Sequence, residues 1–124
     1  MGKEDSLTEM VKEKTARFEK NLQKAIKISE SFFAEIAKKN FRCKTVFMKI
    51  EDTNTFSSLF LVDEDDFCND EFLAIYEESI KIRKENNTDS KFLMSIDFTP
   101  ITKYLDESCL LADGYLMSYN GRIQ

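Results

Sequence analysis

The sequence predicts a single α+β domain over residues 1–124, in which a long N-terminal helix packs on a small mixed sheet. Residues 6–39 carry apolar side chains at steps of three, four and seven, without glycine or proline, as in one amphipathic helix. After Asn40 the pattern changes to alternation and short apolar runs, which are typical of strands. The expected order is α-β-β-α-β-α-β, with the sheet-containing core over residues 43–119.

The first helix is expected to begin at the capping box Ser6-Leu7-Thr8-Glu9. Its apolar stripe consists of Leu7, Val11, Phe18, Leu22, Ala25, Ile26, Phe32, Phe33 and Ile36. Such a helix is about 50 Å long, whereas a domain of this size has a radius of gyration of about 14 Å. The helix therefore breaks near residues 12–15, frays at its start to leave about 25 residues, or extends beyond its own domain.

Residues 44–62 predict an antiparallel hairpin. Val46, Met48 and Ile50 alternate with polar residues, so one face of the first strand is expected to be exposed to solvent. The polar stretch over residues 52–55 supplies the turn. Residues 59–62 are apolar on both faces, which favours a central position for the second strand.

A helix over residues 70–85 and a strand over residues 92–98 complete one right-handed βαβ unit with the second strand. Thr99-Pro100 is expected to begin a third helix, because threonine caps helices and proline suits the first helical position. Ile101, Tyr104, Leu105 and either Leu110 or Leu111 would line its inner face. The helix stops at Asp113-Gly114, and residues 115–119 form an edge strand.

The charge and composition narrow the classes of function. The net charge of -5 weighs against nucleic-acid binding, which needs a positive field. No apolar run is long enough to span a membrane, and no signal-like apolar stretch follows Met1, so we expect a soluble cytoplasmic protein. Cys43, Cys68 and Cys109 are odd in number and far apart, which predicts free and mostly buried thiols.

The chain contains no histidine. This absence removes the usual general base and the usual zinc ligand, and it excludes Ser-His-Asp and Cys-His arrangements within this chain. We therefore predict no catalytic residue and no cofactor-binding residue.

The acidic run Asp63-Glu64-Asp65-Asp66 follows the second strand, and Asp97 lies near the end of the third. If those strands are parallel neighbours, both ends meet at the sheet edge where open α/β sheets bind ligands. Asp63, Asp65 and Asp97 are therefore the candidate ligands for Mg²⁺, which favours carboxylate oxygens. The alternative is that these acids complement the dipole of the next helix in a solvated loop.

Residues 44–119, with the strand Ile96-Asp97-Phe98 and the later Gly114-Tyr115-Leu116, resemble the minimal nucleotidyltransferase-like fold. The resemblance implies that the third acid of that family's metal site falls on Asp97. The family's Gly-Ser turn is absent, because residues 51–58 contain no glycine. Its paired Asp-x-Asp lies within a strand, whereas Asp63 and Asp65 fall past the end of one. The resemblance thus implies a degenerate member.

Three functions follow from these observations. The first is an interaction or regulatory protein without catalytic activity, which self-associates through the first helix or the edge strand. The second is a Mg-dependent nucleotidyltransferase-like or phosphate-processing enzyme that uses the carboxylate cluster. The third is a small-molecule binder with a pocket of phenylalanines, although such residues in strands are usually core. Those phenylalanines are Phe47, Phe60, Phe92 and Phe98.

Overall fold

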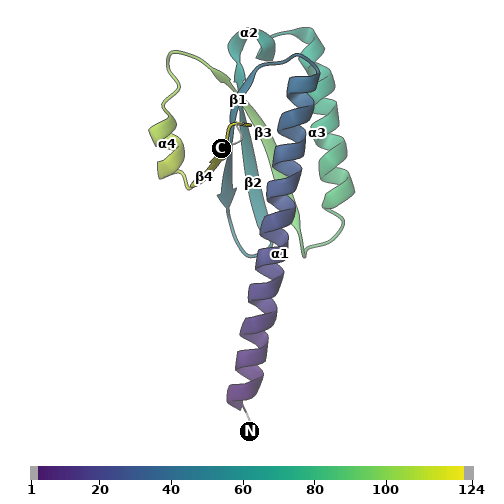
Figure 1. Ribbon diagram of the computed structural model, residues 1–124, viewed down its shortest axis with the longest axis vertical. Helices are drawn as coiled ribbons and strands as arrows, with labels where there is room; N and C mark the ends of the chain where they lie inside the picture. The colour runs from purple at the N-terminus through teal and green to yellow at the C-terminus, as the bar shows by residue number, and fades with distance from the viewer. Residues whose placement is uncertain (1–2, 122–124) are drawn as a thin grey trace.

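The computed structural model describes residues 3–121, with side chains from Leu7 onward, and has the predicted α+β architecture. Its elements are α1 (Lys3–Lys38), β1 (Cys43–Ile50), β2 (Thr55–Asp63), α2 (Glu64–Phe67), η1 (Asp70–Phe72), α3 (Leu73–Asn86), β3 (Leu93–Ile101), α4 (Glu107–Ala112) and β4 (Met117–Tyr119). Apart from the two short helices before α3, this order is the predicted one. Figure 1 shows α1 and α3 side by side against the sheet.

The four strands form a mixed sheet in the order β3-β2-β1-β4. β1 pairs antiparallel with both β2 and β4, and β2 pairs parallel with β3. The predicted hairpin, the central position of β2 and the edge position of β4 are therefore confirmed. Phe60 and Leu61 point to opposite faces of β2 and both have 0% exposure, as a central strand requires.

The core lies between the sheet and the two long helices. Aromatic rings meet there edge to face, with ring centroids 5.2 Å apart for Phe32 and Phe60 and 4.8 Å apart for Tyr76 and Phe98. A serine pair is buried in the same layer, with Ser29 Oγ on α1 2.7 Å from Ser58 Oγ on β2. The Ser29 hydroxyl also donates to the carbonyl oxygen of Ala25 at 2.9 Å, so this polar pair is satisfied inside the core.

α1 is one continuous helix that extends well beyond the sheet (Figure 1). The predicted break near residues 12–15 and the frayed start are therefore wrong, and the extended alternative is confirmed. The helix begins at Lys3, so Ser6 lies inside it and is not its N-cap. Every residue from Leu7 to Arg17 is exposed, and we call residues 3–17 the overhang.

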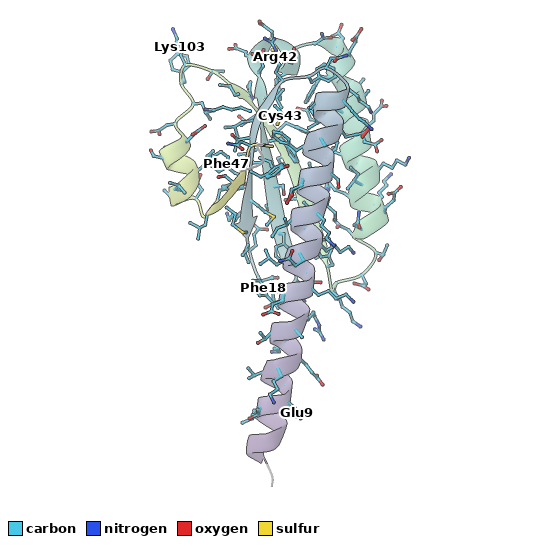
Figure 2. The ribbon with its side chains drawn as sticks, in the orientation of Figure 1. Glu9, Phe18, Arg42, Cys43, Phe47 and Lys103 are labelled. Carbon is cyan, nitrogen blue, oxygen red and sulfur yellow. The ribbon has the colours of Figure 1, made fainter. Side chains whose placement is uncertain are left out.

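Asn21 marks the level at which α1 meets the rest of the domain. Its side-chain amide donates to the carbonyl oxygen of Lys91 at 2.9 Å and to Asn54 Oδ1 at 3.3 Å. These contacts tie the helix to the loop before β3 and to the β1–β2 turn. Figure 2 places Phe18 close to this level and Glu9 far beyond it on the overhang.

The prediction that Thr99-Pro100 begins a helix is wrong. β3 continues to Ile101, and Pro100 pairs with Val62 inside the parallel ladder. Proline is tolerated there because β3 is an edge strand, whose outward side needs no N–H donor.

The helix α4 begins later, with Asp106 as its N-cap. Tyr104 is 82% exposed and Leu111 is 54% exposed, so neither lines an inner face. The predicted stop is correct: Asp113 is the C-cap and Gly114 has φ +99°, a conformation that favours glycine. In the part of the chain that is described, no helix is both long and apolar enough to cross a membrane.

Candidate functional site

The first predicted metal ligand, Asp63, ends β2 and caps α2. Its Oδ1 accepts hydrogen bonds from the backbone N–H groups of Asp65 at 3.0 Å and Asp66 at 3.4 Å. The Nη2 of Arg42 donates to the same oxygen at 3.0 Å. This carboxylate therefore acts as a helix cap and as half of an ion pair.

Arg42 is the residue that organises the acidic run, and the sequence reading missed it. Its Nε lies 3.1 Å from Asp66 Oδ2, and its backbone N–H donates to the same oxygen at 2.6 Å. Hydrogen bonding from Arg42 holds the pKa of Asp66 below its usual value. The run thus joins the start of β1 to the end of β2, a long-range contact that no local spacing indicates.

Asp97 does not join this cluster. In the parallel register it pairs with Leu59, whereas Asp63 pairs with Ile101. Four residues of strand, or about 13 Å, therefore separate the levels of the two aspartates. Asp97 was expected at the sheet edge because the strand was expected to end at Phe98, but β3 runs on to Ile101.

The structure therefore brings Asp63 and Asp65 near each other but does not bring Asp97 to them. Among the described residues, no group of three or more acidic or cysteine side chains is arranged to hold a metal ion. Asp65 is exposed, and its backbone N–H serves the cap.

The thiols are free but not mostly buried, because Cys68 and Cys109 are exposed. Burial raises the pKa of the Cys43 thiol to about 12. The nearby Asp106 carboxylate raises the pKa of the Cys109 thiol. Neither of these two thiols is therefore an activated nucleophile.

The four phenylalanines proposed for a pocket do not line a common one. Phe47, Phe60 and Phe92 are at most 8% exposed, and the Phe98 ring packs 5.8 Å from that of Phe60. A groove of about 280 Å³ does lie between α1 and the β1–β4 pair, but no phenylalanine lines it. Its lining residues are Ile26, Ser29, Glu30, Val46, Met48, Met117, Ser118 and Tyr119.

The edge strand β4 offers little surface to a partner. It is three residues long, and the ring of Tyr119 packs edge to face on Phe33 of α1, with centroids 5.4 Å apart. Tyr115 is half-buried, with Lys49 Nζ 5.6 Å from its ring centroid. These two tyrosines are therefore part of the domain's own packing rather than a free aromatic edge.

The overhang carries a different kind of surface. Leu7, Met10 and Val11 are 60%, 53% and 62% exposed, and we call these three side chains the overhang face. Val11, Phe18 and Ala25 follow one another at steps of seven, so they share one side of α1. Since Phe18 stacks on Phe56 and Ala25 is fully buried, the stripe that packs on the sheet continues into the overhang without a covering element.

Comparison with protein-family models, curated proteins and solved structures finds no match to this chain. The resemblance to the nucleotidyltransferase-like fold therefore stays a prediction. The arguments about function below depend on the chain's own residues.

Proposed function

We propose that this chain is a non-catalytic interaction protein that self-associates through the overhang of α1. The observation that carries the proposal is the exposed overhang face, which continues a stripe that is buried elsewhere in the same helix. Three neighbouring apolar side chains on one helix face are typical of a helix that pairs with another helix. The separation of Asp63 from Asp97 weighs against the metal-dependent alternative.

The charges of the overhang favour a second copy of this chain as its partner. In the sequence, residues 3–9 contain three acids and one lysine, whereas residues 10–17 contain three cations and one acid. An antiparallel pair of overhangs places the acidic half of each copy beside the basic half of the other. A parallel pair would instead place like charges together, so the antiparallel arrangement is favoured.

The expected dimer is weak. Full burial of one such side chain is worth about 1.5–3 kcal/mol, so burying the exposed parts of six side chains is worth roughly 5 to 10 kcal/mol. Association costs at least about 4 kcal/mol in lost translational and rotational freedom. At the upper end of this range the balance is about 5.5 kcal/mol, which corresponds to a Kd on the order of 100 µM.

Sedimentation equilibrium of the full chain tests the proposal. The expected result is a weight-average mass that rises from that of the 14.5 kDa monomer toward twice that value as concentration passes through the expected Kd. Because the pairing is partly electrostatic and partly apolar, added salt should weaken it without abolishing it. A monomer mass at every concentration up to about tenfold above that Kd would overturn the proposal.

A further inference from the structure

A second surface of α1 carries a concentrated positive charge in this acidic protein. A cleft of about 690 Å³ lies between the helix and the segment that leads from α3 to β3. Five cationic side chains line it, namely Arg17, Lys20, Lys24, Lys27 and Lys91. Asp89 is the one carboxylate among its lining residues. The ion pairs formed by the described side chains involve none of these five cations.

Helical spacing places four of the cations in one row. Steps of three, four and three residues separate Arg17, Lys20, Lys24 and Lys27, so they share one side of α1 over about 15 Å. This row is turned away from the apolar stripe, because Lys24 directly precedes the fully buried Ala25.

The opposite wall is held in place by hydrogen bonds to backbone groups. The side-chain amide of Asn21 donates to the carbonyl oxygen of Lys91 at 2.9 Å, which fixes this residue beside the helix. Asp89 Oδ1 accepts from the backbone N–H of Lys91 at 2.8 Å, so the acid is engaged within its own turn. The cleft is therefore built between two fixed walls.

We propose that this basic cleft binds an anion that carries several phosphate groups in a row, such as a triphosphate or a short polyphosphate. Its volume falls within the range of about 300 to 1,000 Å³ that small-molecule sites occupy. Lysines and an arginine at successive turns of a helix match a chain of phosphates by charge and hydrogen bonding. The inference does not rest on the proposed self-association, although Arg17 belongs both to the overhang and to the lining of the cleft.

The lining of the cleft favours phosphate groups over nucleobases as ligands. Phe92 is the aromatic residue among its lining residues, but this side chain is only 5% exposed and Lys24 Nζ lies 4.3 Å from its ring centroid. No stacking surface of the kind that single-stranded nucleic-acid sites use is therefore presented by the described lining. The net charge of -5 further opposes the binding of a long polyanion.

Isothermal titration calorimetry with inorganic tripolyphosphate, in buffer free of divalent metal, tests this inference. We expect one-to-one binding that weakens as sodium chloride rises from about 50 mM to about 200 mM. The double variant Lys20→Ala/Lys27→Ala should bind at least about tenfold more weakly, because each lysine supplies one charge-assisted contact. The matched control is Lys81→Ala/Lys84→Ala on α3, which removes the same charge outside the cleft and should bind within about twofold of wild type.

Three results would overturn the inference. One is the absence of binding by wild type at low salt. Another is an equal loss in the cleft variant and in the α3 control, because this would reflect net charge and not a site. The third is tighter binding of a single-stranded oligonucleotide or of anionic lipid vesicles than of tripolyphosphate. A dimer that forms normally while tripolyphosphate does not bind would refute this inference alone, because the test variants lie outside the overhang.

Discussion

Replacing two residues of the overhang face, in the double variant Leu7→Gln/Val11→Gln, should abolish self-association while leaving the fold intact. Both side chains are about 60% exposed in the isolated chain, so an antiparallel dimer buries the exposed parts of four of them. At about 1.5–3 kcal/mol for each full side chain, the loss is roughly 4 to 7 kcal/mol. Even a loss of half this free energy raises the Kd of the dimer by more than about tenfold.

The stability of the monomer should change by less than about 0.5 kcal/mol, since glutamine is a good helix former and neither residue packs on the sheet. Sedimentation equilibrium measures the dimer, and thermal unfolding followed by circular dichroism measures the fold. Ala16→Gln is the matched control, because Ala16 is exposed and lies five residues after Val11, on the far side of the helix. Self-association that persists in the double variant, or that Ala16→Gln removes equally, would refute the reasoning.

Two further predictions concern the fold. Ser29→Ala should lower the free energy of unfolding in urea by about 2 kcal/mol, because it leaves the buried Ser58 hydroxyl without its acceptor. Ser58→Ala should lower it by about 1 kcal/mol, because Ser29 still donates to the Ala25 carbonyl. A larger loss for Ser58→Ala than for Ser29→Ala would contradict this account. Arg42→Ala should lower Tm by about 2 to 4 °C at pH 7. Arg42 lowers the pKa of Asp66 in the folded state. The difference in Tm between wild type and the variant should therefore be present above the unfolded-state pKa of about 4, and it should be lost as the pH falls through the folded-state pKa. A difference in Tm that is undiminished at about pH 2 would count against this account.

The sequence predicted the sheet well where burial on one or both faces determines the pattern. The run that includes Phe60 and Leu61 is a direct consequence of cover on both faces of β2. The solvent-exposed face predicted for β1 is wrong at Phe47, which is only 8% exposed because β1 lies between β2 and β4. The prediction was wrong at Pro100. Proline often occupies the first turn of a helix, but it is also tolerated in an edge strand, and β3 lies at the edge of the sheet.

The candidate site was predicted less well than the fold. Convergence of acids depends on strand register, and a strand that ends three residues later than expected moves Asp97 away from the sheet edge. The role of Arg42 depends on its contact with Asp66, 24 residues later in the chain, and such a contact cannot be predicted from local sequence patterns. The basic cleft also joins distant segments, since the hydrogen bond from Asn21 to Lys91 links residues 70 positions apart in the chain.

The overhang was one of three outcomes that the length of the apolar stripe allowed, and its physics explains why a partner is needed. A helix of about 15 residues is marginal in water when isolated, but residues 3–17 extend a helix whose nucleus is already formed against the sheet. Polar helix formers would therefore suffice to continue it. Leu7, Met10 and Val11 add nothing to the packing of the domain, and they leave apolar surface in water. Their free energy is recovered only if this face is covered, and the opposite charges of the two halves of the overhang favour a second copy as its cover.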